Sequence, residues 1–199
     1  MRTAVFALSI GLGVAMWAAA CNGNTAHTED HAPAVTTTSI VVRPTVAWPA
    51  LESIDDAALL ALSHDGTVAD RDVRSLIARS PVPVLAPKAL KLESPTLVVE
   101  GEYFALTGRS SGATISLQGT RAAHRYEGIE PATGNRALRG SKGFVSVNEG
   151  IRTASWLENG AAYSLDVECS DLRNDARCQS DDFLLSIVAQ LTYVGGSAR

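Results

Sequence analysis

Hydrophobic and polar positions alternate along much of the second half of the chain, which is the pattern of half-buried β-strands. The alternating runs are short, and glycines punctuate them. Runs of this kind predict an antiparallel sheet of about five strands with one face packed on a core and the other in water. The runs are TLVVEGEYFALTG, GATISLQGTRAAH, GFVSVN, IRTASWLENG and AAYSLDVEC.

The turn of one hairpin predicts its pairing in detail. Asn159-Gly160 is a strong signal for a two-residue type I′ turn. A loop of that length pairs Trp156 with Tyr163, because each step away from the turn advances both strands by one residue. The same register predicts one apolar face made of Ala154, Trp156, Tyr163, Leu165 and Val167.

Helical periodicity appears on both sides of the strand-like runs. Residues 51–80 predict a small helical pair with Ser53 and Asp70 as candidate N-caps. Near the C-terminus an apolar stripe predicts one helix that begins after Ser180, ends at Gly195-Gly196 and covers the apolar face of the sheet. The predicted fold class is therefore α+β, an antiparallel sheet with a C-terminal helix, preceded by the helical pair.

Residues 1–21 have a different pattern, with one basic residue, no acidic residue and an apolar run that ends in three alanines before Cys21. The run has the length of a signal-peptide core and is short for a membrane span. This stretch resembles the lipobox of bacterial lipoproteins, in which cleavage makes the cysteine the first residue and lipid is attached to it. Ala18 stands where the family usually has leucine, and secretion after cleavage near Ala20 is the alternative.

The lipoprotein resemblance implies a location in the cell envelope. Lipid on Cys21, palmitate among its chains, would anchor the protein on the periplasmic side, and Asn22 in place of aspartate favours the outer membrane. Residues 22–50 are rich in Thr, Ala and Pro and predict a flexible linker with a reach of roughly 30 Å. The predicted organisation is a signal peptide (1–21), a linker (22–50), the helical pair (51–80) and an α+β domain (81–196).

The three cysteines agree with export. With Cys21 lipidated, Cys169 and Cys178 remain as an even pair, and oxidising compartments allow such a pair to form a disulfide. No further cysteine or histidine lies near this pair, so the sequence predicts no metal site. No phosphate-binding glycine-rich loop is present either, and no cofactor is predicted.

Charge points to one segment. Residues 1–21 hold one of the 17 basic residues and none of the 21 acidic ones, so the rest of the chain has a net charge of −5, and nothing indicates nucleic-acid binding. Against this background residues 121–143 are basic, which suits an anionic envelope ligand or an acidic protein partner. A solvated loop paired with the acidic remainder is the alternative. The candidate partner-binding residues are Arg121, Arg125, Arg136, Arg139 and Lys142.

One motif raises the question of catalysis. Residues 108–112, GRSSG, fit the Gly-x-Ser-x-Gly pattern of a nucleophile elbow around Ser110. That motif requires a strand, a sharp turn and then a helix, whereas the run that follows here alternates like a strand. His124 is the one histidine downstream, and no acidic residue lies between it and Ser110. We therefore expect a protein that is not an enzyme, with a secreted serine hydrolase using Ser110 as the alternative.

The second half of the chain also resembles a domain of unknown function attached to bacterial anti-sigma factors and other envelope proteins. The resemblance rests on a Trp-x-Glu-x-Gly-x-x-Tyr hairpin, here Trp156, Glu158, Gly160 and Tyr163, and on the segment PVPVLAP before the sheet. It spans residues 81–196 and implies an extracytoplasmic α+β sensor or binding module without catalytic residues. The sequence thus predicts a lipoprotein that acts as a non-enzymatic binding module, with a purely structural envelope protein as a further alternative.

Overall fold

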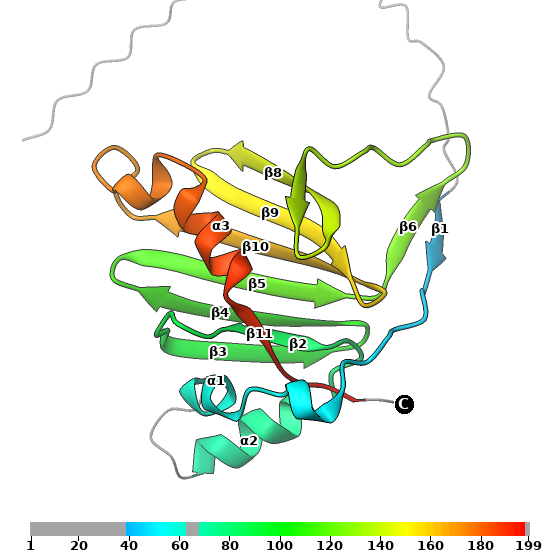
Figure 1. Cartoon of the computed structure of the whole chain (residues 1–199), viewed down its shortest axis with the longest axis horizontal. Coiled ribbons are helices and arrows are strands. Elements are labelled where there is room, and N and C mark those ends of the chain that lie inside the picture. The colour runs from blue at the N-terminus through cyan, green and yellow to red at the C-terminus, as the bar shows by residue number, and fades with distance from the viewer. Residues whose placement is uncertain (1–38, 63–67, 198–199) are drawn as a thin grey trace, which may run out of the picture. The chain divides into compact units, whose positions relative to one another are not determined.

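A seven-stranded antiparallel sheet dominates the structure, a computed structural model that describes residues 39–62 and 68–197 (Figure 1). The strand order is β3-β4-β5-β10-β9-β8-β7, so two meanders meet where β5 pairs with β10. The bounds are β3 (Glu93–Glu100), β4 (Tyr103–Ser110), β5 (Ala113–Thr120), β7 (Arg136–Leu138), β8 (Ser141–Asn148), β9 (Ile151–Glu158) and β10 (Ala161–Cys169).

The sheet is larger than the predicted five strands for two local reasons. The first alternating run contains both β3 and β4, because Gly101, with φ +50°, turns the chain in its middle. The basic segment adds β7, a strand of three residues that is too short to show a period of its own. The prediction of a mostly antiparallel sheet is confirmed, and the number of strands was wrong.

The predicted C-terminal helix is two elements. Helix α3 (Asp182–Ala189) ends at Gln190, and the chain continues as β11 (Leu191–Gly195), which pairs with β2 (Val84–Pro87) in a separate two-stranded sheet. The sequence Thr192-Tyr193-Val194 is rich in β-branched and aromatic residues, which favour a strand over a helix. Pro87, the last residue of β2, is compatible with this sheet because β2 pairs on one side only.

The core lies between the seven-stranded sheet and the layer formed by α3, β2 and β11, which crosses one face of that sheet in Figure 1. Along β10 buried residues alternate with partly exposed ones. The predicted hairpin register is confirmed, with Trp156 opposite Tyr163 and their rings stacked at 5.6 Å between centroids. The largest fully buried side chains include Phe104, Leu106, Ile115, Leu117, Leu165 and Leu184.

The predicted helical pair is present as α1 (Asp56–Ala61) and α2 (Val68–Ile77), which follow the short 3-10 helix η1 (Leu51–Ser53). Asp55, rather than Ser53, caps α1, because its carboxylate accepts a hydrogen bond from the backbone N–H of Ala58 at 3.0 Å. The backbone N–H of Asp55 also donates to the carbonyl of Tyr193, which joins the pair to β11.

The folded part of the chain begins inside the predicted linker. Strand β1 (Ser39–Val42) pairs with β6 (Ala123–Tyr126) in a two-stranded ribbon, and the backbone N–H of Ala47 donates to the carbonyl of Asn159 at 2.9 Å. The boundary at residue 50 was therefore wrong, because the β-branched residues of β1 find their partner more than 80 positions further along the chain. Cys21 and residues 22–38 lie outside the described part.

None of the helices described in residues 39–62 and 68–197 is both long and apolar enough to cross a membrane.

Candidate functional site

Arg43 and Arg121 lie on either side of Glu102, in the turn between β3 and β4. The Nε of Arg43 donates to one carboxylate oxygen of Glu102 at 3.0 Å, and the Nε of Arg121 donates to the other. Arg43 follows β1 and Arg121 follows β5, so three separate segments meet at one carboxylate. Within the described part of the chain, the terminal Nη groups of both arginines donate no hydrogen bond.

The charges of this trio stabilise one another. The hydrogen bond from Arg121, and next to it the one from Arg43, holds the pKa of Glu102 below its ordinary value. In return, Glu102 raises the pKa of Arg121. Glu102 therefore stays ionised at neutral pH and fixes the orientation of two guanidinium groups, whose outer N–H donors remain available to an anion.

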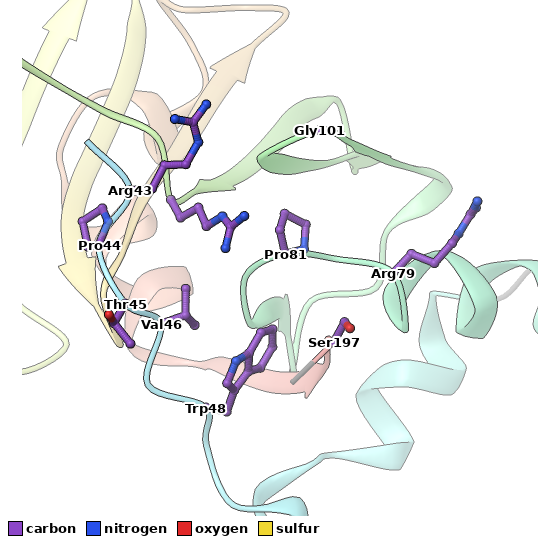
Figure 2. A pocket seen from close by; sticks show the side chains of 10 residues that line it. Arg43, Pro44, Thr45, Val46, Trp48, Arg79, Pro81, Gly101 and Ser197 are labelled. Carbon is purple, nitrogen blue, oxygen red and sulfur yellow. The ribbon is translucent and has the colours of Figure 1, made fainter. Parts of the chain in front are cut away.

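A pocket of about 350 Å³ adjoins this arginine pair. Figure 2 shows Arg43 and Arg79 on opposite sides of it, with Pro81 and Trp48 between them. Arg79 follows α2, and its guanidinium forms no hydrogen bond or ion pair with any described residue. Three guanidinium groups therefore border the pocket. Two of them, those of Arg43 and Arg121, form ion pairs with Glu102, and the third is that of Arg79.

The C-terminal end of the described chain forms one side of the pocket. The backbone N–H of Ser197 donates to the carbonyl of Ser80 at 3.0 Å, which holds this end against the segment between α2 and β2. The indole of Trp48 packs directly on the backbone of Gly196, where an added Cβ would lie 2.4 Å from the ring. Glycine is required at this position, because φ is +151° and the ring leaves no room for a side chain.

The five basic residues predicted from the sequence do not form one surface. Arg121 borders the pocket with Arg43, whereas Arg125 on β6 and Lys142 on β8 are exposed. Arg136 and Arg139 lie together beside α3, where they line a second pocket. Folding has therefore placed Arg121 at the first pocket and Arg136 and Arg139 at the second, with Arg125 and Lys142 at neither.

The two arginines beside α3 already have partners within the protein. Arg139 donates to both carboxylate oxygens of Glu158 and to the backbone carbonyls of Val188 and Leu191. Arg136 lies 3.6 Å from a carboxylate oxygen of Asp181. Arg139 thus connects the β7–β8 hairpin to the C-terminal segment.

The sequence analysis did not identify several residues that line this pocket, among them Arg43, Arg79 and Trp48. Arg43 and Trp48 lie in the stretch predicted as a linker, and Arg79 lies at the end of the helical pair. One signal was present, because the β-branched run of β1 directly before Arg43 favours a strand over a linker.

The predicted cysteine pair is present as a disulfide between Cys169 and Cys178, with the sulfur atoms 2.07 Å apart. Arg177, beside it, donates to the carbonyls of Ser110 and Ser111 and forms an ion pair with Asp175. The hydrogen bond from Arg177 lowers the pKa of Asp175. These contacts hold the disulfide loop against the turn between β4 and β5.

Ser110 does not lie in the geometry of a nucleophile elbow. It is the last residue of β4, its exposed fraction is 8%, and the strand β5 follows directly after the turn at Ser111-Gly112. His124 lies in β6, beyond the far end of β5. Within the described residues, no group of three or more His, Cys, Asp or Glu side chains is placed to hold a metal ion.

No protein-family model matches the chain, and no curated protein or solved structure is significantly similar to it. The family resemblances noted from the sequence therefore stay predictions.

Proposed function

We propose that this chain is an extracytoplasmic lipoprotein of the bacterial cell envelope that acts as a non-enzymatic binding module for an anionic ligand. The observation that carries the proposal is the arrangement of Arg43 and Arg121 around Glu102. The Nη donors of both guanidinium groups make no hydrogen bond within the described residues, and such donors bind carboxylate and phosphate groups with two-point geometry. Of the other basic residues named from the sequence, Arg125 and Lys142 are exposed, whereas Arg136 and Arg139 form ion pairs with Asp181 and Glu158 away from this pocket.

Two features support export and anchoring. The disulfide between Cys169 and Cys178 is of a kind that persists in oxidising compartments. The lipobox-like stretch at Cys21 provides the attachment point, and 17 residues separate it from Ser39 at the start of β1.

The anchoring is tested by expressing the full chain and the variant Cys21→Ala in a bacterial host and separating membrane from soluble fractions. We expect the wild-type chain in the membrane fraction, with a mass spectrum that shows an acylated cysteine at the mature N-terminus. The variant should be neither acylated nor retained. A wild-type chain that keeps Met1 and is found in the cytosol with reduced cysteines would contradict the proposal.

The binding is tested by titrating the full chain, purified in mild detergent, with inorganic phosphate and with pyrophosphate. We expect saturable binding that weakens at least tenfold in the double variant Arg43→Gln, Arg121→Gln. Arg109→Gln is the matched control, because Arg109 is exposed on β4 and does not line the pocket. Equal weakening in the control would show that the anions respond to overall charge, and absence of binding would leave a purely structural envelope protein.

A further inference from the structure

The pocket beside Arg43 and Arg121 is positively charged at one end, and the rest of its lining is non-polar or neutral. Val46, Trp48 and Pro81 form non-polar parts of its lining, and the hydroxyl-bearing residues Thr45 and Ser197 border it. Among the described residues, the indole N–H of Trp48 and the hydroxyls of Thr45 and Ser197 have no hydrogen-bond partner. The pocket therefore combines an anion site with an aromatic ring and neutral polar groups that have no partner within the described protein.

The volume limits the size of the occupant. Small-molecule sites in proteins measure about 300–1,000 Å³, and this pocket, at about 350 Å³, lies near the lower end of that range. It suits one ring with its charged substituent, whereas a bulky multi-ring ligand would extend outside it.

The chemistry of the pocket lining indicates which kind of ligand ring it would bind. Tryptophan offers an apolar face together with an N–H donor, which matches a ring that has both C–H groups and hydroxyls. Neutral hydroxyl groups such as those of Thr45 and Ser197 both donate and accept hydrogen bonds, as sugar hydroxyls do. A planar apolar ring would leave these groups without partners on binding, which costs affinity.

We infer that the pocket binds a single anionic sugar ring, with its phosphate or carboxylate group at Arg43 and Arg121 and its ring against Trp48. This inference rests on the proposed function, because it assigns the ligand class of the same arginine pair. Glu102 fixes both guanidinium groups before the ligand arrives, so less conformational entropy is lost on binding. Arg79, on the opposite side, adds positive charge that attracts the anion.

The test is isothermal titration calorimetry of the full chain in mild detergent with four probes: inorganic phosphate, glucose, glucose 6-phosphate and glucuronate. We expect one of the two anionic sugars to bind at least tenfold more tightly than phosphate or glucose alone. Which of them does so identifies the anionic group. If glucuronate is the tighter ligand, a trimer of galacturonate compared with its monomer separates a glycan source, for which the trimer binds more tightly, from a free sugar, for which it does not.

The contribution of the ring is tested with Trp48→Leu. We expect this variant to reduce the affinity for the anionic sugar to that for phosphate alone, while phosphate binding is unchanged. Thr45→Val provides a second variant in case the loss of Trp48 disturbs packing on Gly196, and it should weaken sugar binding about threefold to tenfold because the hydroxyl is worth roughly one hydrogen bond. Arg109→Gln again serves as the control.

The outcomes separate this inference from the proposed function. If phosphate and the anionic sugars bind equally well, and neither Trp48→Leu nor Thr45→Val changes their affinity, the sugar assignment is overturned while anion binding stands. If no anion binds at all, both fail together.

Discussion

The guanidinium of Arg139 forms a two-point ion pair with the carboxylate of Glu158, in which Nε lies 2.6 Å from Oε2 and Nη2 lies 2.9 Å from Oε1. The side chains are largely buried, with exposed fractions of 17% and 20%. The indole N–H of Trp156 donates to the same carboxylate, and the remaining Nη1 of Arg139 donates to the carbonyl of Leu191 at 2.8 Å. One arginine thereby joins the sheet to the C-terminal segment.

Replacing Arg139 should therefore destabilise the fold. Arg139→Gln leaves Glu158 with a partly buried charge, and we expect the free energy of unfolding to fall by about 2–4 kcal/mol. Arg139→Lys should recover only part of this, because lysine lacks the planar two-point geometry. Urea denaturation measures the free energy of unfolding of both variants. Arg125→Gln, at an exposed site on β6, should stay within about 0.5 kcal/mol of wild type, and a similar result for Arg139→Gln would show that the ion pair contributes little.

Tyr163 links the sheet to the segment directly before β2, because its buried hydroxyl donates to the carbonyl of Pro83 at 2.9 Å. Tyr163→Phe should cost about 1–2 kcal/mol in the free energy of unfolding, since the carbonyl loses its partner inside the core. Burial raises the pKa of Tyr163, so in a spectroscopic titration it should ionise after the exposed tyrosines. Tyr103→Phe is the matched control, because that hydroxyl contacts Glu100 at the surface. Equal losses in the two variants would contradict this account.

The disulfide between Cys169 and Cys178 closes a short loop, with a sequence separation of 9. In the chain-entropy model a loop of this size contributes about 2.5–3 kcal/mol by restricting the unfolded chain. The double variant Cys169→Ser, Cys178→Ser should lower the free energy of unfolding by this amount, measured in urea on a Cys21→Ala background so that no other thiol interferes. Addition of a reductant should lower the stability of the parent and leave the double variant unchanged. A parent chain insensitive to reductant would show that the pair is not oxidised.

The contact of Glu102 with Arg121 and Arg43 predicts a dependence on pH. The arginines lower the pKa of this carboxyl below its ordinary value of 4.5, so ionised Glu102 contributes stability that is fully present above that value. The contribution is lost as the pH falls through the lower pKa of the folded state. Unfolding measured between pH 2 and pH 7 (about the range where carboxylates titrate) should show Glu102→Gln approaching wild type at the acidic end and falling below it near neutrality. Glu130→Gln in the exposed loop is the control, and a constant difference between wild type and Glu102→Gln across the range would be the contrary result.

Local signals in the sequence were sufficient where the structure depends on neighbouring residues. The type I′ turn at Asn159-Gly160 determined the register of β9 and β10, because the length of a hairpin loop sets which residues face each other. Alternation of apolar and polar residues identified the buried face of β10 in the same way. The pairing of Cys169 with Cys178 followed from the number of cysteines, because only these two remain when Cys21 is predicted to carry lipid.

Local signals failed where a segment is stabilised by a distant partner. The apolar residues after Gln190 continue the apolar stripe of α3, so periodicity alone does not separate them from the helix, although their side chains favour a strand. Pairing with β2 makes them the strand β11. The same holds for β1, whose partner β6 lies far along the chain. One of the two strands missing from the predicted number is β7, which is recognisable only through its pairing with β8.

The candidate site belongs wholly to this second class. By itself the sequence determined three features of the protein: a mostly antiparallel sheet, one disulfide pair, and a basic segment containing Arg121. Only the tertiary structure decided that Arg121 would share the carboxylate of Glu102 with Arg43, 78 positions before it in the chain, and that Trp48 would lie beside them. The physical reason is that a binding site depends on which side chains approach in space, and that approach is set by long-range strand pairing and core packing, which leave no periodic pattern around Arg43 or Trp48.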